Sequence, residues 1–332
     1  MHCRRLSRLL SLFLLLCLSL PHASRAEIQS FGFESLGLRV GVQLPSVPLN
    51  ISSSKSSTTD ETKALDYQQN AAPKIGLGFD WGFLGLYLSF LNLAPAEDRA
   101  KFGKTEYFDL QFHFFAENWG VDLVWQNFKG YYLANTKALL PAYYAANGNL
   151  IREDLESFFA GVNLTYVLNP DRLSYSAAMS GTALQKSNGG SWSFLMGYSD
   201  QELSSKTTLA PENLAEDYGV MGNIKNAHFK TFGLGGGYGY SWGFFTTWYF
   251  HISGSLALGP QYQVYSTQDQ GSARRWSGSA KGLLRMALGS GNKRYFGGLS
   301  FITDTTGFRV EDKVLEFTSN FSFLYFGIRL GI

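Results

Sequence analysis

The sequence lacks the usual marks of a soluble enzyme and of a helical membrane protein. Its only two cysteines, Cys3 and Cys17, lie near the start of the chain, and charged residues make up 16% of the whole. The longest apolar run, Leu9 to Leu20, covers 12 residues, whereas a membrane-spanning helix needs about 20. We find no convincing helical period after it. These absences exclude a helical membrane bundle.

The apolar run instead indicates a secretory signal peptide over residues 1–26. Arg4, Arg5 and Arg8 precede the run, and Ser24-Arg25-Ala26 supplies small residues at a cleavage site. We expect cleavage after Ala26, which leaves one domain over residues 27–332. The mature chain then has no cysteine, and therefore no disulfide and no thiolate metal site.

Removing the signal peptide also changes the charge. Four of the 28 basic residues and none of the 26 acidic residues lie within it, so the mature chain carries a net charge of −2. This composition gives no electrostatic reason to expect nucleic acid as a partner. The three remaining histidines, His113, His228 and His251, are too far apart in sequence to predict a metal site, and no motif predicts a cofactor.

What the sequence has in abundance is aromatic residues, at 16%, and 36 glycines, arranged in segments of period two. In residues 107–117 the apolar positions are even, including Phe108, Leu110 and Phe112, while Asp109 and Gln111 are odd. Such alternation gives one apolar and one polar face. Several runs reach 11 to 15 residues, against about 5 or 6 in globular sheets.

This pattern predicts an all-β fold, a single closed antiparallel transmembrane β-barrel of about 12 to 14 strands in the bacterial outer membrane. Outer-membrane lipids are then its surroundings. We expect 14 strands, with 12 as the alternative, near residues 32–44, 73–81, 83–92, 105–117, 120–132, 156–168, 172–183, 190–201, 229–240, 244–258, 274–289, 293–303, 307–316 and 320–332. Counting these strands puts the long polar segment 203–227 on the periplasmic side, where short turns belong, so one strand is miscounted or this segment folds into the lumen.

The end of the chain, YFGIRLGI, resembles the C-terminal signal of outer-membrane barrels, carried here by Tyr325, Gly327, Leu330 and Ile332. The resemblance implies the barrel-assembly machinery as a partner. Phenylalanine is more usual than Ile332 at the last position.

A second resemblance covers most of the mature chain. Residues 101–111 (KFGKTEYFDLQ), 125–132 (WQNFKGYY), 172–178 (RLSYSAA) and 185–187 (QKS) resemble the bacterial family described as domain of unknown function 4421. That family implies an outer-membrane barrel, and neither an activity nor a functional residue comes with it.

Two groups of polar residues are candidate sites. A lumenal cluster of Lys104, Asp109, Gln111, Gln126 and Lys129 is expected on the inner face of adjacent strands, either as an ion-pair network that fills the lumen or as a ligand or ion constriction. His251 and Ser253 share one strand face, as a lipid hydrolase would require. We expect structural hydrogen bonds at this pair and assign no catalytic residue.

Three functions therefore stay open. The first is a non-enzymatic outer-membrane barrel, structural or acting as a narrow pore or binding barrel for a small solute whose identity the sequence does not reveal. The second is an outer-membrane hydrolase that acts on lipid or lipopolysaccharide, which requires His251 and Ser253 to face lipid. The third is a secreted soluble β-sandwich that binds carbohydrate.

Overall fold

The computed structural model describes residues 26–53, 64–82, 84–92, 96–245, 247–268, 271–311 and 313–331 of the 332-residue chain. The signal peptide, apart from Ala26, lies outside these residues and stays a prediction. Within the described ranges no helix is long and apolar enough to cross a membrane.

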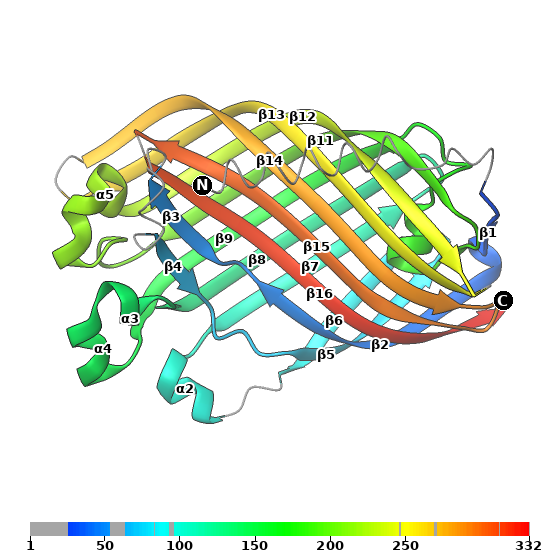
Figure 1. Ribbon diagram of the computed structural model, residues 1–332, viewed down its shortest axis with the longest axis horizontal. Helices are drawn as coiled ribbons and strands as arrows, with labels where there is room; N and C mark the ends of the chain where they lie inside the picture. The colour runs from blue at the N-terminus through cyan, green and yellow to red at the C-terminus, as the bar shows by residue number, and fades with distance from the viewer. Residues whose placement is uncertain are drawn as a thin grey trace.

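The protein is one antiparallel ring of 12 strands (Figure 1). The strands are β2 (Ser35–Ser46), β5 (Lys74–Trp81), β6 (Leu84–Asn92), β7 (Glu106–Phe115), β8 (Trp119–Leu133), β9 (Leu150–Val167), β11 (Gly189–Ser204), β12 (Ile224–Phe244), β13 (Trp248–Thr267), β14 (Gly271–Gly291), β15 (Tyr295–Val310) and β16 (Lys313–Gly331). The last strand, β16, pairs with both β15 and β2 and so closes the ring. The closed sheet has no first and no last strand, and this confirms the predicted barrel and excludes the two-sheet sandwich.

The two ends of the barrel differ. One end, called the turn end, holds β1 (Ile28–Ser30) and the C-terminus of the chain. It is on the right of Figure 1. At the other, the loop end, the connections carry most of the additional elements. These are β3 (Leu49–Ser53), β4 (Leu65–Gln68), α2 (Ala96–Phe102), α3 (Thr136–Leu139), α4 (Pro141–Asn147) and α5 (Ala215–Gly222).

Two of the predicted strands are wrong, and their removal reduces 14 to 12. Residues 172–183 do not join the wall: they fold inward, with a short π-helix (Ser176–Ser180) followed by β10 (Ala183–Gln185), which pairs only with β1. The segments expected at 293–303, 307–316 and 320–332 are two long strands, β15 and β16. With this count, residues 203–227 fall at the loop end, where long connections were expected.

The outer wall carries an apolar belt next to the turn end. Large side chains that are 40% exposed or more include Val40, Leu77, Phe79, Leu88, Phe108, Leu123, Phe194, Leu234, Leu299, Leu324 and Phe326. Trp81, Trp119, Trp192 and Trp248 are exposed where strands meet their turns. Such a belt with aromatic residues at its rim is what a barrel presents to lipid.

The wall is uneven in height. Strands β5, β6 and β7 have 8, 9 and 10 residues, while β12 and β14 have 21 each. Beyond the short strands, the β3–β4 hairpin continues the sheet from β16 across to β8. The loop end is therefore closed by a different set of strands than the belt.

Candidate functional site: the lumenal polar network

The lumen inside the belt contains buried ion pairs, two of which join neighbouring strands. Arg39 of β2 lies 3.1 Å from Asp80 of β5, and Lys281 of β14 lies 2.8 Å from Asp304 of β15. All four side chains are at most 7% exposed. Buried charges are stable only when they are paired, so each pair holds its two strands together.

The third pair crosses the lumen. Arg285 of β14 donates to Asp122 of β8, and His113 of β7 lies 2.7 Å from the same carboxylate. Strands β8 and β14 are not neighbours in the sheet. This contact therefore bridges opposite walls and narrows the space between them.

The predicted lumenal cluster is partly wrong. Asp109, Gln111 and Gln126 face inward, with Gln126 fully buried, but Lys104 and Lys129 are exposed on the outside. Lys104 precedes β7 and pairs with Glu106 at the surface, while Lys129 is three residues from Gln126 and so has the opposite parity in a strand. The cations that fill the lumen come instead from Arg39, Lys281, Arg285 and Arg329.

Those cations carry a signal that the sequence analysis did not use. Lys281 and Arg285 are four residues apart on β14, so they lie on one face of the strand between outward apolar positions. A charged residue at an inward position of an apolar alternating strand predicts a lumenal cation. The acidic partner of such a cation across the barrel cannot be predicted from the neighbouring sequence, because only closure of the ring brings the two residues together.

Asp109 differs from the other inward aspartates of the belt. Asp80, Asp122 and Asp304 each contact an arginine or lysine, whereas no basic side chain of the described ranges lies within ion-pair distance of Asp109. Its carboxylate accepts hydrogen bonds from two amides, those of Gln43 and Gln111. Lys74 of β5 places its ammonium group over the ring of Tyr107, 3.6 Å from the centroid.

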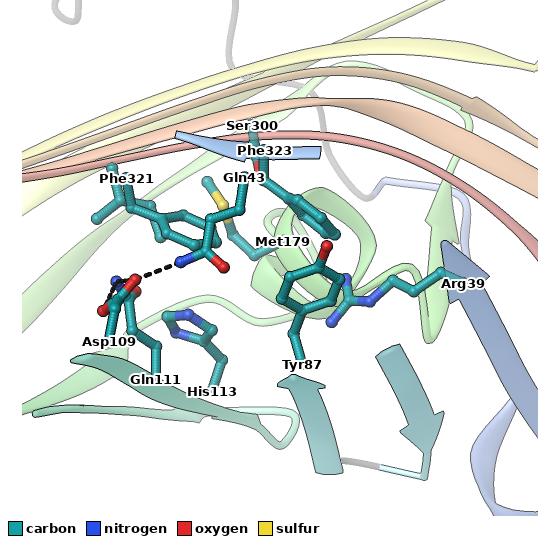
Figure 2. Close-up of a pocket in the computed structure, with 11 residues that line it drawn as sticks. Arg39, Gln43, Tyr87, Asp109, Gln111, His113, Met179, Ser300, Phe321 and Phe323 are labelled. Atoms are coloured by element: carbon teal, nitrogen blue, oxygen red, sulfur yellow. Dashed lines mark hydrogen bonds between the residues drawn. The ribbon is translucent and has the colours of Figure 1, made fainter. Parts of the chain in front are cut away.

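Asp109 lies on the wall of a small cavity lined by β2, β6, β7, β15, β16 and Met179 of the π-helix (Figure 2). The cavity has a volume of about 20 Å³, enough for about one water molecule. Figure 2 shows Gln43 reaching Asp109 on one side, and Tyr87 and Arg39 on the other. A second cavity of about 20 Å³ shares His113 and Gln111 with the first. The Nε2 atom of His113 has no hydrogen-bond partner among the described atoms, so a water molecule fits there.

The turn end is blocked by residues 172–187, the plug. Tyr175 packs edge-on against His251, with centroids 5.3 Å apart, and Arg285 lies over the same tyrosine ring. Arg329 of β16 donates to the Gly181 carbonyl oxygen over 2.7 Å. The plug is therefore bound by the same arginines that line the lumen.

The loop end is blocked by an apolar core that closes the barrel mouth. It joins inward side chains of the wall strands with residues from β3, β4, α5 and the connecting segments. Its members are Val47, Leu49, Ile51, Leu65, Tyr67, Phe128, Tyr131, Leu133, Leu140, Leu155, Leu203, Leu209, Ala210, Tyr218, Met221, Ile224, Ala227, Phe229, Phe308, Val310, Leu315 and Phe317. Dense packing of this kind leaves no passage among the described residues.

One ion pair fastens the 205–224 connection over that core. Arg152 donates to the carbonyl oxygens of Thr208 and Leu209, and Asp154 accepts hydrogen bonds from the backbone N–H groups of Lys206 and Thr207. Arg152 and Asp154 are 2.9 Å apart. Burial opposes ionisation of Asp154, but the hydrogen bonds and charge of Arg152 prevail and lower its pKa to about 2.

His251 and Ser253 lie inside the barrel. They are 0% and 2% exposed, and the ring of His251 hydrogen-bonds both Ser253 and Ser241. A lipid hydrolase would need this pair on the lipid face, so the geometry contradicts that use of the pair. No group of three metal-ligating side chains occurs in the part of the chain that the structure describes.

The residues of the predicted assembly signal lie on the closing strand. Tyr325 faces inward at 5% exposed, Leu330 faces outward at 42% exposed, and a side chain at Gly327 would collide with Phe296. Ile332 lies outside the described residues. Their recognition by an assembly machinery stays a prediction.

Comparisons with known proteins place the chain in a family. The family model described as domain of unknown function (DUF4421) matches residues 38–329. The chain belongs to this family. No curated protein sequence matches the chain.

Solved structures show a weak likeness. The outer-membrane protease OmpT of Escherichia coli has a TM-score of 0.36 at 8% identity, covering 90% of this chain and 97% of its own. The toluene transporter TbuX of Ralstonia pickettii has 0.31 at 10%, covering 90% of each chain. The toluene transporter TodX of Pseudomonas putida has 0.24 at 10%, covering 86% of this chain and 68% of its own. Scores this low carry no argument about activity.

Proposed function

We propose that this protein is a bacterial outer-membrane barrel that is closed to bulk solvent and acts as a structural or small-solute-binding barrel. One observation carries the proposal: within one ring, the belt is apolar outside and ion-paired inside, and the lumen is blocked at both ends. In water an exposed belt of this size would aggregate, and in lipid it is the stabilising surface.

The blocked lumen distinguishes this proposal from a standing pore. A pore needs a continuous aqueous path, whereas the cavities described above, between the plug and the loop-end core, have volumes of about 20 Å³. Each admits about one water molecule. The wild-type barrel should therefore not conduct ions.

The proposal is tested on mature protein from membrane fractions. An unboiled band that runs faster than the boiled band on a detergent gel is expected, because a closed barrel resists detergent. Planar bilayers containing the protein should then conduct no more than empty bilayers, with protease protection in matched vesicles showing that the barrel has inserted. Steady conductance would overturn the closed barrel, and recovery in the soluble fraction would overturn the membrane location.

A further inference from the structure

The wall has a fork between β6 and β7. The two strands pair only from Leu84 to Tyr87 of β6, opposite residues 114 down to 111 of β7. Beyond Tyr87, β6 continues in register with β5 alone, and residues 106–110 of β7 pair with β8 alone. Along the described part of this stretch no pair joins β6 to β7, so two strand edges face each other across a gap in the ladder.

The fork begins in the middle of the apolar belt. Leu88, the first residue past the last pair, is in register with Leu77, which is in register with Val40, and all three are 47% exposed on the outer wall. On the other side of the fork Phe108 is 55% exposed. The fork is therefore an interruption of the strand ladder at the level of the lipid.

The cavity of Figure 2 lies directly behind the fork. The last paired residues of β6 and β7, Tyr87 and Gln111, both line the cavity. Asp109 is the next inward residue along β7. The Tyr87 ring packs edge-on against Phe323, with centroids 4.3 Å apart, and its hydroxyl donates to the Gly41 carbonyl oxygen over 2.7 Å. The inner end of the fork is therefore a carboxylate beside aromatic rings.

This combination selects a cation. Among the described residues Asp109 has amide partners and no ion pair, while Arg39, which lines the same cavity, is already paired with Asp80. An ammonium group is about the size of the single water molecule that the cavity admits, and it is attracted both by a carboxylate and by aromatic faces. An anionic head would instead meet the carboxylate of Asp109 directly.

We propose that the β6–β7 fork is a lateral binding site for small amphipathic amines, with the ammonium group at Asp109 and the apolar body between the two strand edges. The body then lies beside Leu88 and Phe108 at the level of the lipid. The amine reaches the lumen through the wall, because both ends of the barrel are blocked. This inference rests on the proposed membrane-embedded barrel.

Binding is tested by calorimetry on the mature protein in detergent with three probes of equal length: butylammonium, butanol and butyrate. Butylammonium should bind at least about tenfold more tightly than the other two, because a hydrogen bond to an ionised partner contributes more than a neutral one. Asp109→Asn should abolish this preference. Asp66→Asn, a matched change in β4 outside the cavity, should leave it unchanged.

The position of the body is tested with cysteine pairs, which the mature chain permits because both natural cysteines lie in the predicted signal peptide. Leu88→Cys with Leu110→Cys, bridged by a short bismaleimide, spans the fork and should abolish butylammonium binding. The matched pair Leu86→Cys with Phe112→Cys joins two residues that face each other where β6 and β7 are paired. Its bridge should leave butylammonium binding unchanged.

The outcomes separate the two proposals. A chain that lacks heat modifiability overturns the barrel in the membrane. A heat-modifiable barrel that binds butylammonium no better than butanol overturns the amine site alone, and this comparison needs no variant. Binding that survives Asp109→Asn in folded protein, or survives the Leu88–Leu110 bridge, overturns the placement of the head or the body.

Discussion

The belt half and the loop-end half of this barrel are built with opposite polarity. In the belt, Arg285 and Asp122 fill the inside and Phe194 and Phe326 cover the outside. At the loop end, Phe317 and Leu315 fill the inside. Strand β16 runs through both halves without a break, carrying Phe317 inward at one end and Arg329 inward at the other.

The difference shows that alternation alone does not define the inside of a barrel. A period of two sets which residues share a face, and the solvent outside sets which face is polar. Where lipid surrounds the wall, the apolar face turns outward. Where water surrounds it, the same strands bury their apolar face as a soluble protein does.

The largest losses of unfolding free energy are expected from truncating one buried side chain in each half of the barrel. Arg285→Ala leaves Asp122 buried with only His113 as a partner, which should cost about 3–5 kcal/mol of unfolding free energy. Urea unfolding of the reconstituted barrel measures the loss. The double variant Arg285→Met with Asp122→Leu should recover much of the lost stability. If it does not, the unpaired Asp122 charge is not the cause of the loss.

Phe317→Ala tests the loop-end interior. Phe317 is 1% exposed and packs against Phe308, so its truncation should cost about 3–5 kcal/mol through the cavity left behind. The same urea assay applies. If this core packs like that of a soluble protein, Phe317→Leu should lose clearly less unfolding free energy than Phe317→Ala. Equal losses in the two variants would argue that the site collapses around either residue.

Exterior substitutions should have an effect in one half only. Phe194→Arg, at a residue of β11 that is 61% exposed, should cost about 2–4 kcal/mol in lipid vesicles. Glu202→Arg lies on the same strand and face beyond the belt and should change stability little. Equal losses of stability at both positions would contradict a boundary between a lipid-facing half and a water-facing half.

A pH effect should be confined to the loop end. The pKa of Asp154 is lowered to about 2 by Arg152 in the folded protein. The stabilising contribution is therefore present above the ordinary pKa of about 4 and is lost as the pH falls through the folded value. Acidification from pH 5 toward pH 2 should expose residues 205–224 to proteolysis by an acid protease before the belt unfolds. In Asp154→Asn this segment should be cleaved equally at both pH values.

The smallest effect is expected from the lysines predicted for the lumen. Lys104→Ala and Lys129→Ala remove exposed side chains outside the wall, and surface ion pairs contribute little to stability. Neither the urea midpoint nor butylammonium binding should change. A loss of binding in either variant would contradict the outward placement of these lysines.

Much of the wall was predictable from local pattern. The segment around Phe108 and Asp109 alternates as expected, and both residues lie on the predicted faces. Residues 172–183 were not predictable, because their pattern also suits a strand and their inward course depends on Arg329 and β1. Lys129 lies outside because it is three residues from Gln126 on β8, and residues an odd number apart in a strand point to opposite faces.

The sequence by itself determined that the chain forms a barrel: period two in long aromatic-rich strands suits a single sheet with one lipid-facing side. It also determined that Asp109 and Gln111 share the inner face. Only the tertiary structure decided the number of strands, the partners of the lumenal charges and the fork between β6 and β7. Those features join residues far apart in the chain, such as Arg285 and Asp122, and only closure of the ring brings such residues together.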